Sequence, residues 1–126
     1  MAEEAENKVK NKSKKSDWGG NMLERTQNIP LFSRVSQLTK VQREKLISGY
    51  DLKSFARIFE DADTMATVDS FLENGMNVSE TARKLYMHRN TLIYRLNKIN
   101  RLTGLDLRIF DMAVTFEILR ILYELK

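Results

Sequence analysis

Helical periodicity dominates the chain from residue 22 onward. Apolar residues recur every three to four positions, as they do along one face of an α-helix. No segment alternates apolar and polar residues as a half-buried strand does, and no Asn-Gly or Asp-Gly pair stands between two strand-like runs. The pattern therefore predicts an all-α fold, a helical bundle without a sheet.

Residues 1–21 lack this periodicity. Five lysines are spaced among Asn and Ser between residues 8 and 15, and Val9 and Trp18 are the only bulky apolar residues after Met1. So few apolar side chains cannot bury enough surface to offset the entropy of ordering the chain. We therefore expect a disordered basic arm over 1–21, followed by a helical N-terminal segment over 22–63.

A proline, capping residues and apolar stripes indicate where the helices between residues 22 and 73 lie. Pro30 interrupts the first helical stretch because its ring disfavours helical backbone just before it. Thr39 and Gln42 have the spacing of a capping box, and Gly49 ends the helix that they begin. Asp51 is the predicted N-cap of the next helix. The two helices that follow Asp51 each have one apolar stripe, formed by Leu52, Phe55, Ile58 and Phe59 and by Met65, Val68, Phe71 and Leu72.

The next two helices are short and joined by a short turn. The first begins at Asn77, with Glu80 three positions later, and directs apolar side chains inward at Val78, Ala82 and Leu85. The second follows His88, ends at Gly104, and directs inward Leu92, Leu96 and Ile99, with Leu102 as a further candidate. Two short helices with such a connection, the second more basic, have the form of a helix-turn-helix.

The last helix, predicted over 109–125, is apolar on more than one face. One stripe contains Val114, Ile118, Ile121, Leu122 and Leu125, and others contain Phe110, Phe116, Leu119 and Tyr123. Such a helix is either central in a core or buried against a partner. In a chain of this length we favour a homodimer interface through 109–125, with a purely intramolecular role as the alternative.

Composition excludes several classes of protein. The chain has no cysteine and one histidine, so disulfides, cysteine metal sites and multi-histidine metal sites are impossible. The lone His88 has no carboxylate beside it in the sequence, and no phosphate-binding loop or paired acidic motif occurs. We therefore expect no enzyme, no catalytic or metal-binding residue and no cofactor. No apolar run approaches the roughly 18–20 residues of a membrane span, and the first 15 residues lack the apolar stretch that a signal peptide requires. We therefore expect a cytoplasmic protein without membrane contact.

Charge is distributed unevenly although the net charge is only +4. Residues 51–75 carry six acidic and two basic side chains, a net −4, whereas residues 76–102 carry six basic and one acidic, a net +5. A basic block of this kind is the electrostatic footprint of a protein that binds a polyanion. The alternative is an ordinary solvated helix face, and charge alone does not decide between the two.

If residues 89–103 enter the major groove of DNA, the N-terminal positions lie nearest the bases. Arg89 and Asn90 are suited to read guanine and adenine by bidentate hydrogen bonds. Phosphate contacts are expected from Thr91, Tyr94, Arg95 and Lys98. The start of the preceding helix offers another phosphate site through Asn77, Ser79 and Thr81. His88 is expected to cap the second helix or to contact DNA, and Met87 to plug the space between the helices.

The string "HRNTLIYRL" at residues 88–96 resembles the C-terminal helix-turn-helix of the PucR/CdaR family of bacterial transcription regulators. The similarity extends over about residues 65–125 and includes Asn77, Thr81, Ala82, Leu85, Leu102, Thr103, Gly104, Asp106 and Leu107. More distantly the unit is similar to the Fis-type DNA-binding domain. The resemblance implies a PucR-like domain over 64–126 in which Arg89 contacts a base and Thr91 a phosphate.

The resemblance does not cover residues 1–50. Full-length members of the family usually carry a large N-terminal sensory region, so the chain is either a small stand-alone regulator or a fragment of a longer one, and any small-molecule effector is unknown. We expect a sequence-specific DNA-binding transcription regulator with double-stranded DNA as its partner. A protein-interaction module that keeps the helix-turn-helix shape and a non-specific nucleoid-type DNA binder are the alternatives.

Overall fold

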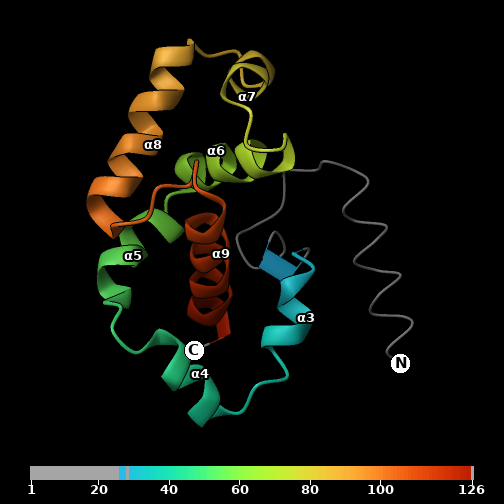
Figure 1. Cartoon of the computed structure of the whole chain (residues 1–126), viewed down its shortest axis with the longest axis vertical. Coiled ribbons are helices and arrows are strands. Elements are labelled where there is room, and N and C mark those ends of the chain that lie inside the picture. Colours follow the sequence, from blue (N-terminus) through green and yellow to red (C-terminus); the bar gives the residue numbers. More distant parts are fainter. Residues whose placement is uncertain (1–25, 28, 126) are drawn as a thin grey trace. The chain divides into compact units, whose positions relative to one another are not determined.

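The computed structural model describes residues 26, 27 and 29–125, and these form seven α-helices and no strand (Figure 1). The expected all-α fold is confirmed for this part of the chain. The predicted arm over 1–21 lies outside the described residues. The helices are α3 (Leu31–Val35), α4 (Lys40–Ile47), α5 (Leu52–Phe59), α6 (Ala62–Glu73), α7 (Val78–Lys84), α8 (Arg89–Thr103) and α9 (Phe110–Leu125).

The N-terminal helices begin where their sequence signals predict. Pro30 immediately precedes α3, and its φ of −54° is already close to the helical value. Thr39 and Gln42 form the predicted capping box of α4, with the Thr39 hydroxyl accepting from the Gln42 N–H and the Gln42 side chain accepting from the Thr39 N–H. Among the described residues, these helices form one compact unit that extends to Tyr50 and includes residues 118–125, and in which Val35, Leu119, Ile121 and Leu122 are buried.

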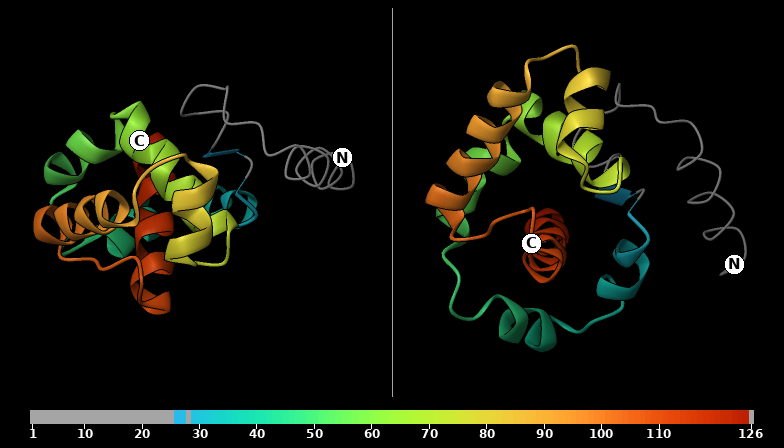
Figure 2. Two further views of the ribbon diagram at one scale, coloured as in Figure 1. Left: turned by 90° about the horizontal axis from the view of Figure 1, so that it is seen from above. Right: turned by 45° about the horizontal axis from the view of Figure 1, so that its top comes forward.

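Residues 51–117 form the other compact unit, which holds α5 to α8 and the first half of α9. Within it α5 packs against α6 and α8, and α7 packs against the same two helices (Figure 2). Asp51 and Asp61 cap α5 and α6 by accepting from the N–H groups of Lys53 and Asp63. The predicted boundary between residues 63 and 64 falls inside α6, whereas this compact unit begins at Asp51.

Aromatic and aliphatic side chains fill the core of this unit. The Phe59 ring stacks on Phe55 with the centroids 5.6 Å apart and meets Phe116 edge-on at 5.3 Å. Such aromatic pairs contribute beyond their buried area. Most predicted inward positions are buried, namely Phe55, Ile58, Phe59, Met65, Val68, Phe71, Ala82, Leu92, Leu96 and Ile99. Leu52, Leu72, Val78 and Leu85, which were also predicted to face inward, are only half-buried. Leu102, a further candidate for the core, is instead 42% exposed.

Helix α9 differs most from its predicted pattern. Its buried large apolar residues are Phe116, Leu119, Ile121 and Leu122, so the buried face combines two of the predicted stripes. Val114, Ile118 and Leu125 are only half-buried. Ile109 and Phe110 remain 48% and 69% exposed just before and at the start of the helix. A single copy of the chain therefore already buries much of the apolar surface that we expected a dimer to cover.

Candidate nucleic-acid interface

The turn between α7 and α8 is built by two backbone hydrogen bonds. The Met87 N–H donates to the Ala82 carbonyl at 3.0 Å and the Tyr86 N–H donates to the Arg83 carbonyl at 3.2 Å. This pair of bonds is a Schellman motif, which requires left-handed backbone at its central residue. Tyr86 supplies it with a φ of 53°. The motif reverses the chain within a few residues, so α8 leaves in a new direction from α7 (Figure 1).

His88 caps the N-terminus of α8. Its Nδ1 accepts a hydrogen bond from the Asn90 N–H at 3.0 Å, which satisfies one of the N–H groups left unpaired at a helix start. The predicted capping role is confirmed. Because an accepting Nδ1 carries no proton, Nε2 holds the ring proton in the neutral form and is a free donor for a partner.

Helix α8 has separate inner and outer faces. Leu92, Leu96 and Ile99 are no more than 1% exposed, as predicted. Six polar residues on the remaining faces are exposed, namely Arg89, Asn90, Thr91, Tyr94, Lys98 and Arg101. The Arg101 guanidinium carbon lies 5.8 Å from the centroid of the Tyr94 ring, a cation–π contact. Arg101 was not among the predicted site residues, although its position seven residues after Tyr94 places it on the same face.

Arg95 is held by the fold more than the sequence suggests. Its Nη1 donates to the hydroxyl of Thr67 in α6 at 2.8 Å, and its side chain is half-buried. Thr67 is 2% exposed and donates its own hydroxyl proton to the Asp63 carbonyl at 3.0 Å. Thus one amino group of the guanidinium that was predicted to bind phosphate instead joins α8 to α6.

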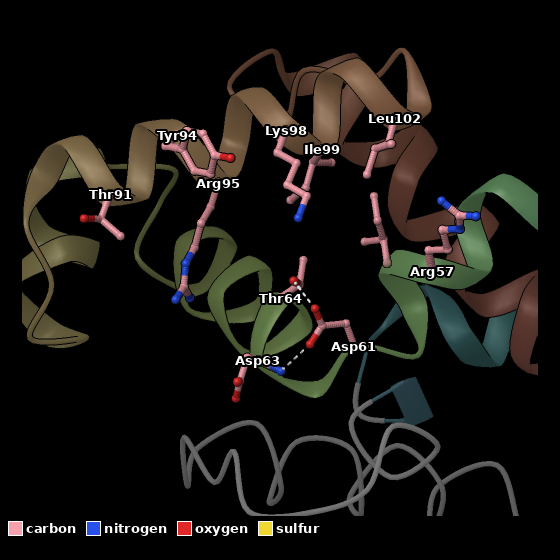
Figure 3. Close-up of a pocket in the computed structure, with 11 residues that line it drawn as sticks. Arg57, Asp61, Asp63, Thr64, Thr91, Tyr94, Arg95, Lys98, Ile99 and Leu102 are labelled. Atoms are coloured by element: carbon pink, nitrogen blue, oxygen red, sulfur yellow. Dashed lines mark hydrogen bonds between the residues drawn. The ribbon is translucent and has the colours of Figure 1, made fainter.

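An open groove of about 570 Å³ lies between α8 and the residues of α5 and α6 (Figure 3). Lys98 extends from α8 toward the start of α6, where Asp61 accepts from the hydroxyl of Thr64 at 2.8 Å. The Thr64 hydrogen bond chiefly lowers the pKa of Asp61, and the positive charge of Lys98 adds to the effect. Asp63 also lines the groove, so carboxylates partly balance the positive charge of α8 on this side.

Helix α7 presents only part of its predicted phosphate site. Asn77 caps the helix, with its Oδ1 accepting from the Glu80 N–H at 2.9 Å, and Ser79 is exposed. Thr81, however, is fully buried, and its hydroxyl donates to the Asn77 carbonyl at 2.7 Å. This burial contradicts the expectation that Thr81 contacts a phosphate. Its position one turn after the N-cap directs the side chain back onto the helix start.

The loop after α8 is tied to the middle of that helix. The Arg108 guanidinium donates to Oδ1 of Asn97 at 2.6 Å and to Oδ1 of Asp106 at 2.8 Å. The hydrogen bonds from Arg108 lower the pKa of Asp106. Asn97 is therefore engaged within the unit.

A second charge pair lies on α7. The Arg83 guanidinium donates to the Glu80 carboxylate, and this contact lowers the pKa of Glu80 and raises that of Arg83. Both side chains are exposed enough for the pair to exchange with solvent, so it contributes little to stability. None of the helices in the described part of the chain has the length and apolar character needed to cross a membrane.

Comparison with known proteins gives matches to the helix-turn-helix portion. Residues 64–119 match the PucR C-terminal helix-turn-helix domain. The purine catabolism regulatory protein of Bacillus subtilis (strain 168) is 47% identical over 49 residues, which cover 39% of this chain and 9% of that protein. The carbohydrate diacid regulator of Escherichia coli (strain K12) is 47% identical over 45 residues, or 36% of this chain and 12% of that protein.

A longer match is to an uncharacterized protein, YxkF, of Bacillus subtilis (strain 168), which is 31% identical over 77 residues, or 61% of this chain and 26% of that protein. The chain thus spans about a quarter or less of the length of these three relatives. No solved structure matches the chain significantly. The matched residues contain α7, its turn and α8 with the capped, two-faced geometry described above, and they confirm the resemblance seen in the sequence. Residues 64–119 of this chain are therefore similar to the C-terminal helix-turn-helix domain of PucR.

Proposed function

We propose that the chain is a transcription regulator that binds double-stranded DNA with α8 in the major groove. The observation that carries the proposal is the position of Arg89 and Asn90. Both are exposed in the first turn of α8, directly after the His88 cap, on a helix whose opposite face is buried. The N-terminal turn of a recognition helix is the part that reaches base edges. A protein acting on chromosomal DNA in bacteria works in the cytoplasm.

Specific readout in this proposal comes from two side chains. Arg89 bonds the O6 and N7 atoms of a guanine, and Asn90 bonds the N6 and N7 atoms of an adenine. Contacts to phosphate fix the register of the helix without reading sequence. On α8 these come from Thr91, Tyr94, Lys98 and the free part of Arg95, and on α7 from Asn77 and Ser79. His88 donates a further hydrogen bond to phosphate through its Nε2–H.

We also propose that two copies act together. Ile109 and Phe110 stay exposed within one chain, and they lie in the predicted dimer segment 109–125. Pairing through this end would cover both side chains and would place two recognition helices about one helical turn of DNA, roughly 34 Å, apart. The Phe110→Glu variant should then sediment as a monomer at concentrations where the wild-type chain is a dimer. A wild-type chain that is monomeric at every concentration would refute this part of the proposal alone.

The central experiment is a selection from a random duplex library followed by anisotropy titration. A duplex of about 30 base pairs, long enough for two half-sites, is recovered with the wild-type chain and compared with a scrambled duplex of the same composition. A specific regulator binds the recovered duplex about a thousandfold or more tightly than the scrambled one at physiological salt. Comparable affinity for both duplexes indicates a nucleoid-type binder, and binding to neither leaves a protein-interaction module.

A further inference from the structure

Four of the described helices, α4, α6, α7 and α8, are followed by left-handed backbone, and α7 alone among them has no glycine at that position. The φ angles at the ends of α6 and α8 are 67° at Gly75 and 78° at Gly104. At the end of α7 the equivalent residue is Tyr86, with a φ of 53°. Left-handed backbone crowds the Cβ of every residue except glycine, so Tyr86 adopts a conformation that disfavours its own side chain.

The ends of α6 and α7 have the same pair of backbone hydrogen bonds, although at α6 the residue after the glycine, Met76, is also left-handed with a φ of 62°. At α6 the Met76 N–H donates to the Phe71 carbonyl at 2.9 Å and the Gly75 N–H donates to Leu72 at 3.2 Å. At α7 the Met87 and Tyr86 N–H groups make the two corresponding bonds. The same Schellman motif thus has Gly75 in one case and Tyr86 in the other. The motif itself has no need of the tyrosine.

The ring of Tyr86 buries almost no surface that could offset this backbone strain. The residue is 97% exposed, the highest exposure among the large hydrophobic residues of the described chain. A large aromatic side chain normally stabilises a fold through the area that it buries. Here a strained residue holds a solvated ring at the surface, a combination that is found where a side chain is presented to a partner.

The surroundings of Tyr86 indicate the chemistry of that partner. The residue stands in the turn two positions before the His88 cap and three before Arg89, and Arg83 and Lys84 close the preceding helix. In a docked helix-turn-helix the second helix reaches the bases while the first crosses the sugar-phosphate backbone. The turn that joins them therefore faces the backbone. Tyrosine hydroxyls are among the groups that donate to DNA phosphates.

We propose that Tyr86 is a DNA-backbone contact, with its phenolic hydroxyl donating a hydrogen bond to a phosphate beside the base pairs that Arg89 and Asn90 face. The left-handed backbone is what aims the ring outward from the turn. This inference rests on the proposed function, because it needs α8 to dock in the major groove.

Two substitutions separate this role from a structural one. Tyr86→Phe removes only the hydroxyl and should weaken binding about tenfold to both the recovered and the scrambled duplex, because the lost bond is to a phosphate. Tyr86→Gly removes the ring and relieves the backbone, so it should weaken binding at least as much while leaving the thermal midpoint of unfolding equal to or above that of the wild type. Tyr50→Phe, a second exposed tyrosine outside the helix-turn-helix, is the matched control and should bind like the wild type.

The outcomes distinguish this inference from the function on which it rests. Normal affinity in both Tyr86 variants, together with a loss in Arg89→Ala, refutes the backbone contact and leaves the proposed function intact. A loss by Tyr86→Phe confined to the recovered duplex also refutes it, because a phosphate contact carries no sequence preference. Failure of the wild-type chain to bind any duplex overturns the proposed function and this inference together.

Discussion

Arg95 and Thr67 lie 28 positions apart in the sequence, and the 2.8 Å hydrogen bond between them joins α8 to α6. Because Thr67 is buried, it cannot touch DNA, whereas Arg95 is half-buried and keeps part of its guanidinium outside. Arg95 therefore has two separate roles. It joins α8 to α6 through Thr67, and the exposed part of its guanidinium is available to a ligand.

If the Arg95–Thr67 hydrogen bond stabilises the unit, substitutions at the two residues should have non-additive effects on the free energy of unfolding. Thr67→Val keeps the volume but removes the acceptor, and it should lower the free energy of unfolding by about 1–3 kcal/mol. Arg95→Ala should lower it by a similar amount, and the double variant should lose less than the sum of the two. Urea unfolding followed by circular dichroism measures all three. Strictly additive losses would show that the hydrogen bond does not stabilise the unit.

The cap at His88 predicts a loss that one other residue restores. His88→Ala removes the acceptor for the Asn90 N–H and should lower the free energy of unfolding by about 1 kcal/mol. His88→Asn supplies a new acceptor at the same position and should recover most of it, because Asn is among the best N-cap residues. Equal losses in the two variants, measured by urea unfolding at neutral pH, would argue that the ring acts by something other than capping.

Base reading and phosphate binding predict different signatures in α8. Arg89→Ala should weaken binding to the recovered duplex by about 1–3 kcal/mol and relax the preference at one base pair. Lys98→Ala should weaken binding to every duplex and flatten the slope of log affinity against log salt by about one unit. Anisotropy titrations over a salt series compare the two variants. If Arg89→Ala weakens both duplexes equally, Arg89 is a phosphate contact.

The hydrogen bonds between Asp106 and Arg108 predict a dependence of stability on pH. Folding lowers the pKa of Asp106, so its stabilisation is fully present above the unfolded-state pKa and is lost as the pH falls through the lower folded-state pKa. Asp106→Asn should therefore be less stable than the wild type at pH 7. The difference should shrink as the pH is lowered below the usual range of an aspartate. A difference that is constant from neutral to acid pH, in urea titrations of both proteins, would exclude the charge as its source.

Features that depend on neighbours in the sequence were predictable. The caps at Thr39, Asp51, Asn77 and His88 follow from side chains that bond N–H groups two or three residues ahead, and each is present. The buried stripe of α8 was predictable for the same reason, because helical spacing alone determines which side chains share a face.

Features that depend on distant partners were not predictable. Nothing in the sequence near Arg95 indicates its hydrogen bond to Thr67, so Arg95 was expected only to contact phosphate. Nothing near Asn97 indicates its hydrogen bond from Arg108. Thr81 was expected to contact phosphate because it stands near a helix start, yet the helix directs it into the core. In α9 several adjacent stripes are apolar, so periodicity could not select the one that the fold buries. The left-handed backbone of Tyr86 had no signal in the sequence, because glycine usually marks that position.

The buried apolar face of α8 and its exposed N-terminal residues are separate, so the DNA preference can be redesigned without altering the core. Leu92, Leu96 and Ile99 are buried and anchor the helix, whereas Arg89 and Asn90 are exposed. Exposed positions of this kind accept substitution at a cost within about 0.5 kcal/mol of stability. Residues 89 and 90 at the N-terminus of α8 can therefore be replaced with little effect on stability. A library that varies only these two residues should yield new DNA preferences on the same fold.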